Sequence, residues 1–186
     1  VPQFVSRARA EGIGASPQPD YDRIRLNGYD FSSFGQEPVL PPDLALSDYR
    51  GLGLYLVQTP GPNRDEWESA LRTVGEPILY YPENTYLVRA ESAQIWALRG
   101  SPAFQYVGVY QPAFKIRPDI LVAEGPVPAT VQLDGGRDLT GVTAIIEALA
   151  GRKVELEESG PIRNATLTLT GPWQWGDDLI GRLSGP

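Results

Sequence analysis

The sequence contains no cysteine, no histidine and no methionine. Without cysteine, no disulfide holds the fold and no thiol chemistry is possible. Without histidine, the commonest general base and the commonest metal ligand are missing, which excludes Ser-His-Asp triads and zinc sites of ordinary composition. The absence of methionine leaves few targets for oxidation. Together with 18 prolines, this composition favours a hot or harsh environment, as in a thermophile.

Long apolar runs and positive charge are also scarce. No run approaches the ~20 residues needed to span a bilayer, so we expect no membrane partner. The net charge of −7 repels phosphate backbones, which argues against a nucleic-acid partner. An acidic surface suits a basic or electrostatically complementary protein. No signal peptide is visible and Val1 is not an initiator, so the chain looks trimmed.

The residues that are present form a pattern of elements that occurs twice. In the first copy, alternation, helical spacing and turn residues predict a strand, a helix, two strands of a hairpin, a short helix and a strand, over residues 52–58, 64–74, 77–81, 85–90, 91–99 and 104–110. Asn63 and Glu66 resemble a capping box at the start of the first helix. Gly75 is predicted to end that helix in the left-handed conformation.

The second copy begins with a strand over residues 129–133 and a helix that starts at Asp138 or Thr140. Gly151 ends this helix, and strands follow at residues 153–157 and 165–170. Pro172 suits the first turn of a last helix. A final strand would be due next, so we expect the second copy to have an unpaired sheet position that invites a partner.

The repeated pattern predicts an α+β fold of two tandem ferredoxin-like (βαββαβ) units with antiparallel sheets, the second lacking its last strand. We expect an extended leader at residues 1–50, a first unit at 51–116, a linker at 117–128 and an incomplete second unit at 129–186.

The leader carries Tyr29, Phe31 and Phe34 between its prolines. These aromatics favour extended chain that packs across a neighbouring domain, and the alternative is a disordered linker. The sheet of the first unit is apolar on both faces, whereas the face without helices is normally polar. We therefore expect a cover on that open face, supplied by the second copy, the leader or another protein.

Carboxylates are the remaining catalytic candidates. Asp177 and Asp178 lie near the start of a predicted helix, where the helix dipole favours negative charge. Glu155 and Glu157 alternate with apolar neighbours and form the solvated side of a strand. No acid–base partner lies near either cluster, so we interpret both as structural.

No cofactor or metal site is predicted. Asp134, Gly135 and Gly136 lie between a strand and a helix, but they lack the lysine of a phosphate loop and the spacing of a dinucleotide loop, which indicates a turn. A calcium site would need a spaced Asp/Asn/Gly loop, which is absent.

One part of the sequence resembles a known family. The segments YLVQTPGPNRDEWESALRTVGEPILYYPENTYLVRA, WALRGSPAFQYVGVYQPAFKI and LNGYDFSSFGQEPVLPPDL are similar to the N-terminal propeptide of bacterial subtilisin-like serine peptidases. The resemblance covers residues 25–120 well and the second copy loosely. It implies a secreted or periplasmic bacterial protein whose partner is its cognate peptidase domain, and which assists folding of that domain and then inhibits it.

In that family the open face of the sheet packs on the peptidase, and the segment after the last strand enters the active-site cleft. The candidate partner-binding residues are aromatic or aliphatic positions of the first sheet: Tyr55, Val57, Tyr86, Val88, Phe104 and Tyr106. Which alternate set faces outward stays open, because both sets are apolar.

We expect the chain itself not to be catalytic. The main alternative function is a stand-alone protein-interaction module with tandem ferredoxin-like domains. A third hypothesis, an enzyme that uses carboxylates alone, such as a glycosidase, needs two carboxyl groups about 5–9 Å apart across one cleft, and no such cleft is indicated.

Overall fold

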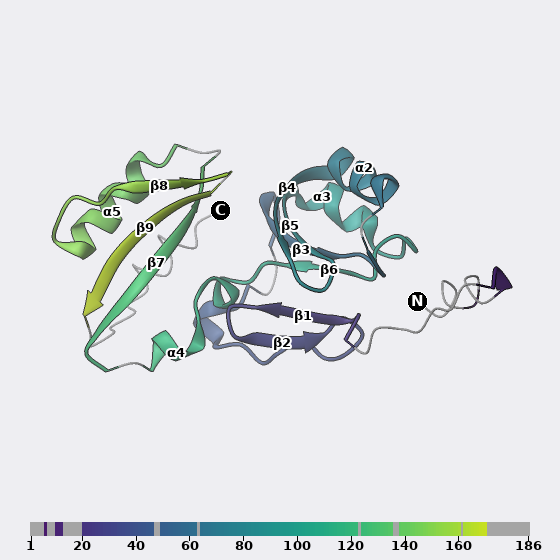
Figure 1. The fold of residues 1–186 in the computed structure, drawn as a ribbon, viewed down its shortest axis with the longest axis horizontal. Coiled ribbons are helices and arrows are strands. Elements are labelled where there is room, and N and C mark those ends of the chain that lie inside the picture. The colour runs from purple at the N-terminus through teal and green to yellow at the C-terminus, as the bar shows by residue number, and fades with distance from the viewer. Residues whose placement is uncertain are drawn as a thin grey trace. The chain divides into compact units, whose positions relative to one another are not determined.

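The computed structural model describes residues 6, 10–12, 20–46, 49–62, 64–122, 124–135, 138–160 and 162–170. The chain forms two compact units, Val1–Phe114 (unit 1) and Lys115–Gly185 (unit 2), whose elements are drawn in Figure 1. Both units combine antiparallel sheets with few helices, so the predicted α+β class is confirmed. No helix in the described ranges is long and apolar enough to cross a membrane.

Unit 1 contains a four-stranded antiparallel sheet with the order β4-β5-β3-β6. The predicted strand over residues 52–58 is confirmed with the same bounds, as β3. The strands and helices of this unit are β1 (Arg23–Leu26), β2 (Tyr29–Ser32), η1 (Pro42–Leu44), β3 (Leu52–Gln58), α2 (Asp65–Val74), β4 (Gly75–Tyr81), β5 (Thr85–Glu91), α3 (Ser92–Ile95), η2 (Trp96–Leu98), β6 (Tyr106–Val109) and η3 (Pro112–Lys115).

Helix α2 forms where an apolar stripe coincides with favourable charges at both ends. Asp65, Glu66 and Glu68 lie in its first turn, where the helix dipole stabilises negative charge. An ion pair of 2.6 Å joins Arg72 to Glu68 one turn earlier. The residue before the helix has no side-chain cap, and the predicted capping residue, Asn63, lies outside the described residues.

Gly75 differs from its prediction. Its φ of −173° is extended rather than left-handed, and it is the first residue of β4. Glycine is required at this position for a different reason. A Cβ there would lie 2.6 Å from the carbonyl oxygen of Arg89 and 2.7 Å from Ala90 Cβ, which is too close. Glycine therefore permits the close approach of β4 to β5, and the chain passes from helix to strand without a turn.

Two apolar cores lie on opposite faces of the unit 1 sheet. In the helix-side core, Leu71 of α2 and Ile95 of α3 pack, together with η2, against alternate residues of the strands. The second core packs the β1–β2 hairpin against the other face, through Ile24, Leu26 and Phe31. Figure 1 shows the hairpin and the helices on opposite sides of the sheet.

Unit 2 contains α4 (Pro118–Leu121), β7 (Pro126–Asp134), α5 (Thr140–Ala150), β8 (Leu156–Ser159) and β9 (Ile162–Thr170). Its antiparallel sheet has the order β7-β9-β8. Gly151 ends α5 with a φ of +64°, which confirms that prediction. The predicted last helix, from Pro172, lies outside the described residues.

The linker differs from its expected form. A short helix, α4, occupies part of residues 117–128, and β7 begins at Pro126 rather than at Ala129. The sequence prediction placed Pro126 and Pro128 in the linker, outside the strand. The structure tolerates both prolines because β7 lies at the edge of its sheet.

Candidate functional site

The predicted partner-binding residues do not lie together on one open face. Tyr55, Val57, Tyr86, Val88 and Phe104 are all buried in the helix-side core of unit 1. Tyr106 is half-buried and packs against the core on the opposite face. The first five residues therefore hold the helices on the sheet and present no surface to a partner, so their predicted place on the open face is wrong.

The open face of unit 1 is formed by the other alternate set of residues, and the leader covers it. Leu56 and Leu87 on this face are buried under Ile24 and Phe31 of the β1–β2 hairpin. The Phe31 ring stacks on Phe114 with centroids 5.8 Å apart. Of the three covers expected from the sequence, the structure thus contains the leader, and the face is not bare.

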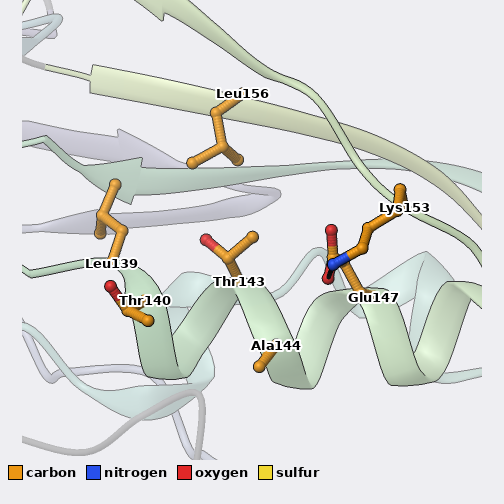
Figure 2. Close-up of a pocket in the computed structure, with 7 residues that line it drawn as sticks. All are labelled: Leu139, Thr140, Thr143, Ala144, Glu147, Lys153 and Leu156. Atoms are coloured by element: carbon orange, nitrogen blue, oxygen red, sulfur yellow. Dashed lines mark hydrogen bonds and ion pairs between the residues drawn. The ribbon is translucent and has the colours of Figure 1, made fainter.

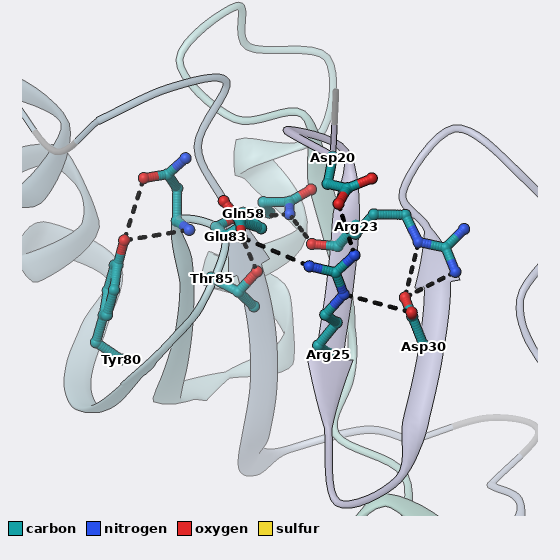
Figure 3. Close-up of polar contacts among 9 residues, drawn as sticks. Asp20, Arg23, Arg25, Asp30, Gln58, Tyr80, Glu83 and Thr85 are labelled. Atoms are coloured by element: carbon teal, nitrogen blue, oxygen red, sulfur yellow. Dashed lines mark hydrogen bonds and ion pairs between the residues drawn. The ribbon is translucent and has the colours of Figure 1, made fainter. Parts of the chain in front are cut away.

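A buried amide fixes the hairpin to the sheet. The Gln58 side chain is fully buried, and its Nε2 donates to the carbonyl oxygens of Arg23 at 2.9 Å and Glu83 at 2.8 Å. Gln105 Nε2 donates to Gln58 Oε1 at 2.6 Å and to the Tyr21 carbonyl oxygen at 3.0 Å. Gln58 at the end of β3 and Gln105 just before β6 thus satisfy two backbone carbonyls of the hairpin segment. Figure 3 shows the contacts of Gln58.

Ion pairs surround this contact. Arg23 lies 2.7 Å and Arg25 3.3 Å from Asp30 across the hairpin, and Arg25 also lies 2.9 Å from Asp20. Arg25 reaches Glu83, in the turn between β4 and β5, at 3.7 Å (Figure 3). The hydrogen bond from Arg23 lowers the pKa of Asp30, and that from Arg25 adds to the shift.

A further polar contact lies beside the second core. The Tyr106 hydroxyl donates to Glu37 Oε1 at 2.7 Å. Burial raises the pKa of Tyr106 far above its ordinary value, and the bond to Glu37 raises it further. The tyrosine therefore stays a neutral donor that holds the chain after β2 on the sheet.

Unit 2 differs on its second face. On the α5 side, Val131 and Leu133 of β7 pack with Ala165 and Leu167 of β9. The opposite face of the sheet is mostly exposed and polar, although Ile162 at the start of β9 is buried there and Asn164 is half-buried. Its residues along β7, β9 and β8 include Thr130, Gln132, Thr166, Thr168, Glu157 and Ser159.

An open groove runs between α5 and β8 (Figure 2). Leu139, Ala144 and Leu156 give it an apolar wall. At one end Lys153 pairs with Glu147 at 2.9 Å, and this hydrogen bond is the main cause of the lowered pKa of Glu147. Both charges are already partnered within the chain, so the groove offers no free acid or base for catalysis.

The placement of the carboxylates bears on the metal and catalytic candidates. The described residues contain no group of three or more Asp or Glu side chains placed to hold a metal ion. Asp177 and Asp178 lie outside those residues. Glu157 is exposed on β8 beside the core residue Leu156, as predicted for the solvated side of a strand.

The sequence does contain a signal for the hairpin, which the sequence reading missed. Asn27 and Gly28 join β1 to β2 with φ values of 45° and 86°. An Asn-Gly pair between alternating apolar residues is the strongest short-range hairpin signal, because both turn positions need positive φ. This signal predicts a cover for the open face from the leader itself.

Comparisons with known proteins give no match. No family model matches the chain, and neither a curated protein nor a solved structure matches it at the significance required.

Proposed function

We propose that the chain is the non-catalytic propeptide of an exported, bacterial subtilisin-like serine peptidase, which assists folding of the peptidase domain and then inhibits it. One observation carries this proposal. Unit 2 presents an exposed polar sheet face and an edge strand, whereas unit 1 uses both corresponding surfaces internally. The chain therefore combines a unit whose sheet is covered on both faces with a unit that has exposed surface for a protein partner.

Both units belong, in this proposal, to the ferredoxin-like class. The order β4-β5-β3-β6 with the elements strand, helix, strand, strand, helix, strand supports this assignment for unit 1. The order β7-β9-β8 repeats the first three strands of that arrangement in unit 2. The segments that resemble subtilisin-like propeptides include β2 and most of the stretch from β3 to β6, which supports a shared origin of these elements.

In this proposal the peptidase docks on unit 2 and not on the sheet of unit 1, which is the surface expected from the sequence. The face of unit 1 is filled by Ile24, Leu26 and Phe31, so exposing it would cost the burial of these side chains. The face of unit 2 carries short hydroxyl and amide side chains such as Thr130, Gln132 and Thr166, which can exchange hydrogen bonds with water for bonds to a partner.

The proposal is tested with the peptidase domain encoded in the same reading frame, or with a purified subtilisin-like peptidase if none is found there. The chain is added during refolding of the acid-unfolded peptidase and, separately, to the folded enzyme with a peptide substrate. We expect a higher yield of active enzyme in the first assay and slower hydrolysis in the second.

A pair of matched variants locates the docking surface. Thr166→Lys places a charge on the exposed face of unit 2, and Thr73→Lys places the same charge on the exposed helix α2 of unit 1. The first variant is expected to weaken both effects at least tenfold, since a misplaced charge in an interface costs several kcal/mol, whereas the second leaves them unchanged. If the unaltered chain changes neither yield nor hydrolysis, the proposed function is wrong.

The second candidate is a stand-alone protein-interaction module. The closed face of unit 1 favours it, because a module that persists after maturation needs no face reserved for a peptidase. The reading frame around the chain separates the two, since only a propeptide is followed by a domain with the Asp, His and Ser motifs of the subtilisin-like type.

A further inference from the structure

Unit 1 provides a template for the addition of a strand to unit 2. In unit 1, β6 lies antiparallel beside β3, with Val107 opposite Val57 and Val109 opposite Tyr55. The amide of Tyr110 donates to the Leu54 carbonyl oxygen at 2.9 Å, and the amide of Gln105 donates to the Gln58 carbonyl oxygen at 2.8 Å. The polar backbone groups of Leu54, Leu56 and Gln58 therefore point toward β6.

The register of the sheets identifies the corresponding positions in unit 2. Gln58 lies opposite the first residue of β5, and Asp134 lies opposite the first residue of β9. Gln58 therefore corresponds to Asp134. Because alternate residues of a strand point to the same side, Leu56 corresponds to Gln132 and Leu54 to Thr130. In the described ranges, no strand pairs with the side of β7 that these residues face.

Two prolines support this assignment independently. Pro126 and Pro128 lie in β7 at the same alternation as Thr130 and Gln132, and all four positions are paired with β9. Proline has no backbone N–H, so a ladder keeps it only where that N–H would point away from the neighbouring strand. The N–H groups of Thr130 and Gln132 therefore point to the outer edge of β7.

We propose that the segment Thr130–Leu133 of β7 is a binding site for a short extended peptide segment, which adds to the sheet of unit 2 as an antiparallel strand. The site is short because Pro126 and Pro128 supply no donors to the first part of the edge. Its four residues equal the length of β6, which also has four. This inference rests on the strand register and not on the proposed function.

The two faces of the sheet define the chemistry of the bound segment. On the α5 side, the added residues lie beside Val131 and Leu133, as Val107 and Val109 lie beside Tyr55 and Val57 in unit 1. Val131 is only half-buried, so apolar side chains there gain contacts. On the other side the neighbours are Thr130 and Gln132, which favour polar residues. The site therefore takes alternating apolar and polar residues, with β-branched apolar ones toward α5.

A second copy of the chain fits this edge less well. Two β7 strands paired antiparallel along their whole length would place the donor-poor segment from Pro126 to Pro128 of each copy against the last residues of β7 in the other. A pairing that avoids this segment would overlap only beyond Pro128. The net charge of −7 adds repulsion between two copies. A separate peptide segment has neither disadvantage.

The probe is the capped peptide KTVTVTK in one-letter code, titrated into the isotope-labelled full chain and followed by NMR. In the free chain, the amides of Thr130 and Gln132 are expected to exchange rapidly with solvent. Bound peptide is expected to shift their resonances and slow their exchange, while those of Leu54 and Leu56 stay unchanged. A nitroxide on the N-terminus of the peptide should broaden Asp134 more than Thr130, because the antiparallel register places it there.

Matched variants separate edge pairing from adhesion to the surface. Gln132→Pro removes an outward N–H and is expected to weaken binding at least about tenfold, since a lost partner at an interface costs about one decade in affinity. Gln132→Ala keeps the N–H and should bind as the unaltered chain does. A peptide N-methylated at its central residue provides the same test without altering the chain.

Three results would overturn the proposal: slow exchange of the Thr130 and Gln132 amides before peptide is added, equal binding of the N-methylated peptide, or a dimer of the free chain that protects the same edge.

Discussion

Strands β3, β4 and β5 with helix α2 in unit 1 are arranged in the same order as β7, β8 and β9 with helix α5 in unit 2. The two units differ in the second face of the sheet. In unit 1 that face is apolar and lies under the β1–β2 hairpin, with Leu56 fully buried. In unit 2 the corresponding position is Gln132, which is exposed. The helix-side cores of the two units are alike, because both consist of apolar side chains at alternate positions of the strands.

The difference shows that the same arrangement of strands and helix occurs with two kinds of second face. A second apolar core makes unit 1 a three-layer body whose surfaces are used internally. A polar second face leaves unit 2 as two layers with an exposed surface. The residues of the second face, rather than the order of the strands, therefore decide whether a second apolar core forms.

The largest effect is expected from exchanging residues at the corresponding positions. Leu56→Gln places an amide in the second core, and the lost packing and unsatisfied polar group should destabilise unit 1 by more than about 4 kcal/mol. Gln132→Leu adds an apolar side chain to an exposed face and should change the stability of unit 2 by less than about 0.5 kcal/mol. Denaturant unfolding followed by residue-resolved hydrogen exchange measures both. Equal effects in the two units would contradict the contrast between their faces.

Removing an anchor of the hairpin is expected to have the next largest effect. Phe31→Ala leaves a cavity between Phe114 and Tyr106, whose rings contact it, and should cost about 3–5 kcal/mol. The matched control is Phe34→Ala, which alters a side chain 61% exposed and should cost little. Thermal unfolding and binding of an apolar dye report the loss. If the two variants behave alike, the hairpin does not seal the sheet.

The buried amide has a smaller expected effect. Gln58→Ala leaves the carbonyl oxygens of Arg23 and Glu83 without their donor, which should cost about 1–3 kcal/mol. Gln132→Ala, in an exposed glutamine, serves as the control for side-chain removal. Hydrogen exchange in Arg23–Ser32 should accelerate in the first variant only. Unchanged exchange there would mean that apolar contacts alone hold the hairpin.

The smallest effect is a dependence of the hairpin on pH. The pKa of Asp30 is lowered in the folded chain, so its carboxylate stabilises the hairpin above the ordinary value of about 3.9, and this contribution disappears as the pH falls below it. Hydrogen exchange in β1 and β2 should be level from neutral pH to about pH 4, after correction for intrinsic rates, and accelerate below it. Asp30→Asn should remove the acid-dependent part. A variant that retains it would assign the effect to another carboxylate.

The sequence predicted most elements because their signals are local. The alternation in Leu52–Gln58 and the helical stripe that contains Leu71 are read within a few residues, and the structure confirms both elements. The left-handed stop at Gly151 follows from the same local chemistry. The strand that starts at Pro126 was missed because the penalty for proline disappears at a sheet edge, and edge position is a property of the whole sheet.

The candidate site was less predictable because it depends on contacts between distant segments. In unit 1 both alternate sets of strand residues are apolar, so the pattern alone does not tell which set faces the helices. The cover over Leu56 comes from residues some 30 positions earlier, around Ile24 and Phe31. The local signals for this cover are the aromatics Tyr29 and Phe31 of the leader and the Asn27-Gly28 turn. The polar face of unit 2, by contrast, follows from the alternation of Thr130 and Gln132 with Val131 and Leu133.

The most direct test of unit 2 as the available unit is hydrogen exchange of the full chain with and without the peptidase domain. The expected result is new protection in β7 and β9, around Gln132 and Thr166, with the exchange of the β1–β2 hairpin unchanged. Faster exchange in Arg23–Ser32 together with new protection of Leu56 would show instead that the hairpin leaves the sheet and that unit 1 provides the binding face.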